Sequence, residues 1–316
     1  MFAPIYSRTK IAELQTIYAN VDWKILSKNP SAIDLLEQNL DKVCWKGLST
    51  NPEAVHILKA NMDKICWSGL SENPNAIDIL EKNLDKVDWT KLSANPNAIK
   101  ILKQNMDKIN YEFLSENPNA IDLLEKNLDK VCWVYLSSNP NAIHILKENL
   151  HEIRWPRLSR NTNGMLILQY NLRKVDWYNL SENPNAVSIL RNNLSVVCWY
   201  GLAKNPNAID IIIENMQKLI LPKFEFGFWS GLSANSNTVA VDILSKNLDK
   251  IVWKDLSSNL NFQGFLSRFL TLDKEKMTEK ISDFKKELVS VVYCPDRISR
   301  ISKMHNISFH DYLIKL

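Results

Sequence analysis

Residues 73–94 read NPNAIDILEKNLDKVDWTKLSA, and this stretch is the unit from which the fold can be predicted. A tryptophan or tyrosine recurs every 22 residues from Trp23 to Trp199 and, after two small shifts of spacing, again at Trp229 and Trp253. The ten tryptophans of the chain all occupy this one position: Trp23, Trp45, Trp67, Trp89, Trp133, Trp155, Trp177, Trp199, Trp229 and Trp253. A unit this short cannot bury its own apolar face and must stack on its neighbours. The sequence therefore predicts a helical solenoid.

Each unit is predicted to contain two short helices. Asn73 can accept the free N–H groups of a helix start, and Pro74 suits the first helical position. Apolar residues at three-to-four-residue spacing then predict an amphipathic helix of about ten residues. The spacing of Val87, Trp89 and Leu92 predicts a second, shorter helix, in part 3₁₀. Because a buried tryptophan supplies a large contact area, we expect the repeated tryptophan to be structural core, wedged between successive units.

A second asparagine also recurs in every unit, and in the quoted stretch it is Asn83. Asparagine tolerates the left-handed conformation at a helix end, and the following Leu84 can fold back onto the last turn. This pattern predicts a Schellman-like helix stop. The alternative interpretation is a ladder of asparagines that satisfies loop carbonyl groups.

Composition and boundaries favour one elongated domain. The 316 residues are 45% apolar and carry a net charge of +4, with 39 basic and 35 acidic residues interleaved. We predict an all-α fold: an α-solenoid of about eleven two-helix repeats, roughly 100 Å long if successive turns lie about 10 Å apart. Residues 1–20 are predicted to form an N-terminal cap and residues 21–261 the solenoid, with an insertion at 218–228. Residues 262–316 are predicted to form a C-terminal helical cap, or alternatively a docking module for a cellular factor.

The pattern W-x-x-L-S-x-N-P-x-A-I-x-[IL]-L-x-x-N-[LM]-x-K-[VI], over residues 20–261, resembles short helical repeats that large nucleocytoplasmic DNA viruses encode in many copies. The unit length and the Asn-Pro start also resemble leucine-rich-variant repeats, which alternate an α-helix with a 3₁₀-helix. The iron–sulfur cysteine cluster of that family has no counterpart here, so the resemblance implies no cofactor. It implies an interaction module of viral origin, with a host factor or a virion protein as its partner.

No feature of the sequence predicts catalysis, and we expect neither catalytic residues nor a bound metal. The motifs of zinc proteases, α/β-hydrolases, P-loops and dinucleotide sites do not occur. Cys44, Cys66, Cys132 and Cys198 stand just before the repeat position in separate units, too far apart for disulfides. Together with the lack of an apolar leader or a membrane span, this pattern favours a reducing compartment. We expect a protein that is not secreted and works in the host cytoplasm or the virion, without membrane insertion or a small-molecule substrate.

Nucleic-acid binding is a further hypothesis, because a lysine recurs in step with the repeat. These lysines are Lys42, Lys64, Lys86, Lys108, Lys130 and Lys174. A column of like charge could follow phosphates. However, a column of aspartates from Asp41 to Asp129 precedes it and offsets its charge, so we expect a solvated ladder of ion pairs instead.

Three departures from the repeat are candidate protein-binding sites. The first is the central unit, where Leu166 and Tyr170 share one outward helix face; a drifted repeat that bends the solenoid is the alternative. The second is an aromatic stripe after the repeat position, which local packing could also explain: Phe113, Tyr135, Tyr178 and Tyr200. The third is the insertion, predicted as a loop that either docks a partner or folds onto the core through Phe224, Phe226 and Phe228.

These features predict a non-catalytic protein–protein interaction scaffold that binds through an extended solenoid face and the aromatic loop. A structural protein of the virion, such as a minor capsid or cement component, is the alternative.

Overall fold

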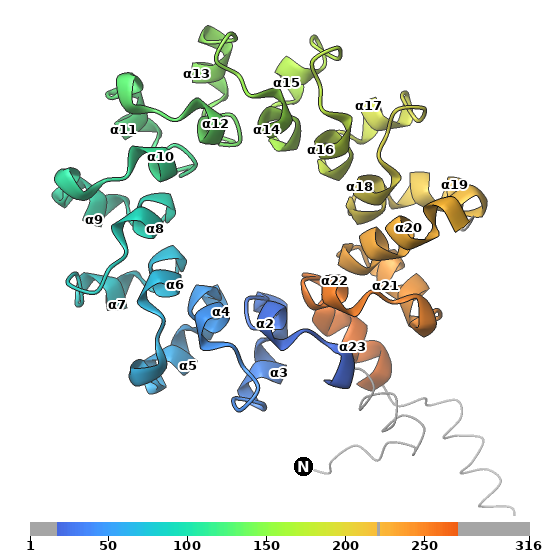
Figure 1. Cartoon of the computed structure of the whole chain (residues 1–316), viewed down its shortest axis with the longest axis horizontal. Coiled ribbons are helices and arrows are strands. Elements are labelled where there is room, and N and C mark those ends of the chain that lie inside the picture. Colours follow the sequence, from blue (N-terminus) through green and yellow to red (C-terminus); the bar gives the residue numbers. More distant parts are fainter. Residues whose placement is uncertain (1–17, 220–221, 271–316) are drawn as a thin grey trace, which may run out of the picture. The chain divides into compact units, whose positions relative to one another are not determined.

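The computed structural model describes residues 18–219 and 222–270, and this part of the chain is helical without a strand. Figure 1 shows that the helices alternate between an inner and an outer row. The inner row consists of α2 (Trp23–Leu26), α4 (Trp45–Thr50), α6 (Trp67–Glu72), α8 (Trp89–Ala94), α10 (Tyr111–Leu114), α12 (Trp133–Leu136), α14 (Trp155–Arg160), α16 (Trp177–Glu182), α18 (Trp199–Lys204), α20 (Pro222–Ala234) and α22 (Trp253–Ser257). The outer row consists of α3 (Ile33–Glu37), α5 (Val55–Ala60), α7 (Ile77–Glu81), α9 (Ile99–Gln104), α11 (Ile121–Glu125), α13 (Ile143–Glu148), α15 (Met165–Leu168), α17 (Val187–Arg191), α19 (Ile209–Leu219), α21 (Thr238–Ser245) and α23 (Phe262–Leu270).

The two-helix unit of an α-solenoid is confirmed, with differences inside the unit. The Asn-Pro dipeptide begins a single turn, which is 3₁₀ in the first two repeats, as in Pro52–Ala54, where the Asn51 side chain accepts from the backbone N–H of Glu53 at 3.0 Å. The α-helix starts only afterwards, so the outer helix α5 is shorter than the predicted ten residues. The second helix of the unit, predicted in part as 3₁₀, is α-helical in α8.

The predicted left-handed helix stop is wrong. Asn61 ends α5 with φ −136° and ψ 52°, and Asn105 ends α9 with φ −137° and ψ 52°. The Asn61 side-chain amide instead donates to the carbonyl oxygen of Ile57 at 2.9 Å, four residues earlier. This asparagine satisfies a carbonyl group of the last helical turn through its side chain, so its backbone does not need a positive φ.

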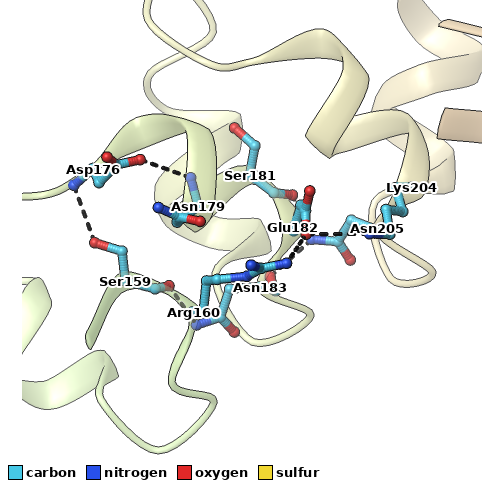
Figure 2. Close-up of polar contacts among 9 residues, drawn as sticks. All are labelled: Ser159, Arg160, Asp176, Asn179, Ser181, Glu182, Asn183, Lys204 and Asn205. Carbon is cyan, nitrogen blue, oxygen red and sulfur yellow. Dashed lines mark hydrogen bonds and ion pairs between the residues drawn. The ribbon is translucent and has the colours of Figure 1, made fainter. Parts of the chain in front are cut away.

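Successive repeats are joined by the asparagine of the Asn-Pro position, which the sequence predicted only as a helix cap. The Nδ2 of Asn183 donates to the carbonyl oxygens of Ser159 and Asn161, both at 3.0 Å. Ser159 adds a second link, because its Oγ accepts from the backbone N–H of Asp176 at 3.0 Å (Figure 2). Each junction therefore satisfies buried backbone groups of two repeats at once.

We call the full set of these residues the asparagine ladder. Each member is buried and donates two hydrogen bonds to the preceding repeat: Asn29, Asn51, Asn73, Asn95, Asn117, Asn139, Asn161, Asn183, Asn205, Asn235 and Asn259.

The ladder closes on itself, so the repeats form a ring. Asn29 of the first repeat donates to the carbonyl oxygens of Ser257 at 3.0 Å and Asn259 at 2.8 Å, both in the last repeat. The backbone N–H of Asp22 donates to Ser257 Oγ at 2.8 Å, the same bond that a serine forms at nine other junctions. These bonds lie inside the compact unit Gln15–Arg268, and α2 packs against α22 at this junction, which we call the seam (Figure 1).

The predicted elongated domain of roughly 100 Å is therefore wrong. Stacking determines only which repeats lie next to each other and not the path of the whole solenoid. A small rotation at every junction adds up to a closed ring after eleven repeats. The first and last repeats cover each other's stacking faces. The predicted N-terminal cap lies almost entirely outside the described residues, and so does the predicted C-terminal cap beyond Leu270.

The core of the ring is made by leucines rather than by tryptophans. Leu48, Leu70 and Leu92 are fully buried in successive inner helices, and Leu58, Leu80 and Leu102 are fully buried in the outer helices. The tryptophans are half-buried, except for Trp229, which is buried. The prediction that they are all core is wrong in this respect, although they do contact the neighbouring repeat.

That contact is made by the lysine column. Lys42, Lys64, Lys86, Lys108, Lys130 and Lys174 place their Nζ atoms 4.6–5.1 Å from the ring centroids of the tryptophan or tyrosine one repeat earlier. The expected ion pairs with the aspartate column are not formed in the part of the chain that the structure describes. The electron-rich face of an indole attracts an ammonium group, and the lysine stem covers the ring at the same time.

The insertion extends helices rather than forming the predicted loop. Pro222–Phe228 belongs to α20, and α19 reaches Leu219. In the other repeats a serine accepts the backbone N–H of the residue that precedes the next tryptophan. Here that residue is Phe228, whose N–H lies inside helix α20. This explains why Ala203 stands at the serine position.

Gly231 is predicted to be the glycine of α20 that cannot be replaced. A Cβ on Gly231 would overlap the carbonyl oxygen of Tyr200 in α18 and lie 2.9 Å from Ala203 Cβ, whereas a Cβ on Gly227 would meet only Tyr200 Cβ at 3.7 Å. We expect Gly231→Ala to lower the free energy of unfolding by about 1–3 kcal/mol through overpacking. Gly227→Ala should raise it by about 0.5–1 kcal/mol, because alanine favours the helix. Thermal unfolding of both variants measures this difference, and two changes of the same sign would contradict the close approach of α18 and α20.

Candidate functional site

The inner row carries a strip of stacked side chains across α6 to α14. The rings of Phe113 and Tyr135 stack with centroids 5.7 Å apart. Lys91 Nζ lies 5.6 Å from the Phe113 centroid, and the Arg157 guanidinium lies 5.7 Å from the Tyr135 centroid. Lys91 also pairs with Glu72 at 2.5 Å, and this hydrogen-bonded carboxylate raises the pKa of Lys91. The strip is thus a pair of stacked aromatic rings flanked on both sides by charged side chains, and it spans five repeats.

A second aromatic pair lies on α16 and α18. The rings of Tyr178 and Tyr200 stack at 6.3 Å, and burial raises the pKa of both phenols. Beside them Glu182 accepts from Arg160 at 2.6 Å and pairs with Lys204 at 3.4 Å (Figure 2). One carboxylate thus links three successive inner helices.

The aromatic stripe therefore consists of two pairs, each packed across one junction. This supports the alternative of local packing, but Tyr178 keeps 51% of its surface exposed. The sequence analysis did not single out Lys91, Arg157 or Glu182. Lys91 and Arg157 could have been found from their positions in the sequence, because they stand in the same repeat column as Phe113 and Tyr135.

The central unit presents two strongly exposed side chains with large apolar surfaces. Leu166 in α15 is 57% exposed, and Tyr170, just after that helix, is 83% exposed. Leu150 and Leu172, which hold equivalent positions in two successive repeats, are also exposed. We call these four residues the outer patch. Leu166 and Tyr170 are both exposed, but Tyr170 follows α15 and does not share its helix face as predicted.

The prediction of a single extended binding face requires the candidate residues to lie on one face of the solenoid, and they do not. Phe113, Tyr135, Tyr178 and Tyr200 belong to inner helices, whereas Leu166 belongs to outer helix α15 (Figure 1). The sequence could place each residue in its repeat column, but it could not show that the columns lie on opposite rows.

Of the two alternatives for Phe228, docking a partner and packing onto the core, the structure supports the second. The Phe228 side chain is fully buried, and its ring meets the ring of Trp229 edge-on at 5.0 Å, so it contributes to the core. Phe224 and Phe226 lie in α20, but their side chains are outside the described part of the structure. Their proposed role in docking stays a prediction.

The described residues hold no group of three or more histidine, cysteine or acidic side chains placed to bind a metal ion. Cys44, Cys66, Cys132 and Cys198 are free and half-buried, each at the start of an inner helix. Among the described helices, none combines the length and the apolar character that crossing a bilayer requires.

Comparison of the chain with protein-family models, curated proteins and solved structures finds no match. The class that the structure defines is that of an α-solenoid of short two-helix repeats, closed into a ring within the described residues 18–219 and 222–268.

Proposed function

We propose that this protein is a non-catalytic scaffold that binds another protein through the outer patch. The observation that carries the proposal is the exposure of Tyr170 and Leu166. Tyr170 stands where other repeats carry residues such as Lys82 and Lys126, and Leu166 stands where they carry Asp78 or Asp122.

An exposed tyrosine beside exposed leucines is typical of a protein-binding surface. Tyrosine is enriched among the residues that dominate binding energy, because it combines a large apolar ring with a hydroxyl group. Contiguous exposed apolar residues on a soluble protein often mark an interaction site. The asparagine ladder supports this use, because it holds α15 in a continuous hydrogen-bonded frame and limits the ordering cost of binding.

The half-exposed pairs Phe113–Tyr135 and Tyr178–Tyr200 are proposed as a second surface on the inner row.

The resemblance to viral repeat proteins supports a viral origin, a host factor or virion protein as partner, and activity in the host cytoplasm or virion. The alternative proposal is a virion structural component, such as a minor capsid or cement protein. A ring closed by its own repeats supports it, since such a ring is a self-contained building block.

The proposal is tested with the variant Leu166→Asp/Tyr170→Lys, which restores the residues that other repeats carry. The matched control is His144→Asp/Glu148→Lys, which changes the same two columns one repeat earlier. Affinity purification with quantitative mass spectrometry should show specific partners reduced at least tenfold for the first variant and unchanged for the control. Equal capture by the wild type and the outer-patch variant would contradict the proposal.

A further inference from the structure

Closure of the ring brings together three lysines that lie far apart in the sequence. Lys254 in α22, Lys24 in α2 and Lys46 in α4 each directly follow the tryptophan of their repeat. At the seam α22 packs against α2, and α2 packs against α4. Because the seam repeats the hydrogen bonds of the other junctions, the three lysines occupy equivalent positions on successive inner helices. All three are exposed, and we call them the seam lysines.

The seam lysines form no ion pair within the described residues. The nearby carboxylates have other partners: Asp22 accepts from the backbone N–H groups of Lys24 and Ile25, both at 3.0 Å, and Asp255 accepts from the Ser230 hydroxyl at 2.5 Å. In the rest of the inner row, Lys91, Arg160 and Lys204 have acidic partners, and Arg157 lies over the Tyr135 ring. Among the described residues, the seam is therefore the part of the inner row where successive helices carry basic side chains without an acidic partner.

We propose that the seam lysines bind an acidic, extended segment of a partner protein. Neighbouring packed helices lie about 8–10 Å apart. An extended polypeptide advances about 3.3 Å per residue, so its every third residue matches the spacing of the lysines. A segment with acidic side chains at that interval would place one carboxylate at each ammonium group.

Single-stranded nucleic acid is the other polyanion to consider, and the seam is less suited to it. Proteins that bind single strands combine positive charge with exposed aromatic rings on which bases stack. The residues that follow the seam lysines are Ile25, Gly47 and Asp255. The aromatic pairs of the inner row lie in other repeats and already stack on one another.

This inference rests on the proposed function as a protein-binding scaffold, but it uses a different surface from the outer patch. The probe is a fluorescein-labelled peptide of twelve residues with glutamate at every third position and glycine and serine between. The test variant is Lys24→Ser/Lys46→Ser/Lys254→Ser. The matched control is Lys59→Ser/Lys103→Ser/Lys147→Ser, which removes three exposed lysines from the outer helices α5, α9 and α13.

Fluorescence anisotropy at low salt should show peptide binding that the seam variant weakens about tenfold or more, since each exposed ion pair contributes modestly. The control variant should change binding less than twofold, and circular dichroism should be the same for all. Three results would overturn the inference: no binding by the wild type, equal weakening by both triple variants, or tighter seam-dependent binding of a twelve-residue oligothymidylate. The variant Leu166→Asp/Tyr170→Lys should bind the peptide normally, so failure here is separable from failure of the proposed function.

Discussion

Asn139→Ala is expected to lower the free energy of unfolding by about 3–5 kcal/mol, because it leaves several buried groups without a hydrogen-bond partner. The Asn139 side chain is fully buried. Its Nδ2 donates to the carbonyl oxygens of Ser115 at 3.0 Å and Asn117 at 2.9 Å, and its Oδ1 accepts from the backbone N–H of Asn141 at 3.0 Å. Alanine replaces none of these bonds, and the neighbouring Leu136 and Leu146 keep water out.

The matched control is Asn141→Ala, two residues further on. Asn141 also bonds to the preceding repeat, since its Nδ2 donates to the carbonyl oxygen of Pro118 at 2.8 Å, but the residue is exposed. Water can take over this bond, so we expect a loss of about 1 kcal/mol or less. Urea-induced unfolding of both variants measures the difference. Equal losses would show that the asparagine ladder does not hold the repeats together.

Leu136→Ala is expected to lower the free energy of unfolding by about 3–5 kcal/mol, through lost apolar burial and the cavity left behind. Leu136 is fully buried at the end of inner helix α12. The control is Val134→Ala in the same helix, where the side chain is 36% exposed and the cost should stay within about 0.5 kcal/mol. Thermal unfolding of the two variants provides the measurement. A Val134→Ala cost equal to that of Leu136→Ala would mean that the leucine column is not the core.

The parts of the fold that could be predicted are those that depend on local chemistry. The 22-residue spacing required stacking, and the Asn-Pro dipeptide identified the start of each outer element. The burial of the leucines could not be separated from that of the tryptophans, because Trp133 and Leu136 lie one turn apart in the same short helix. Periodicity shows that such residues share a face, but it does not show which of them lies deeper.

The role of the ladder asparagines was missed although the sequence contained a signal for it. Asparagine remains at Asn161, Asn235 and Asn259, where the following proline is replaced by threonine, serine or leucine. A helix cap uses only the side-chain oxygen, and the two N–H donors of the amide remain to be satisfied. In a buried position those donors require carbonyl acceptors, and a stacked repeat provides them.

Ring closure could not be read from the sequence, because it depends on the sum of small rotations at eleven junctions. No single repeat specifies that sum. The cluster of seam lysines depended on it as well, since Lys254 becomes a neighbour of Lys24 and Lys46 only in the closed ring. Likewise, the repeat columns could be listed from the sequence, but their division between the inner and outer rows required the structure.

The most direct test of ring closure is a distance across the seam. Spin labels at positions 24 and 254, in a background with the five cysteines replaced by serine, can be compared with labels at positions 24 and 46 by double electron–electron resonance. A closed ring predicts the same short, narrow distance distribution for both pairs, since each pair spans one junction between neighbouring helices about 8–10 Å apart. A short distance for 24–46 with a broad or much longer distance for 24–254 would contradict closure.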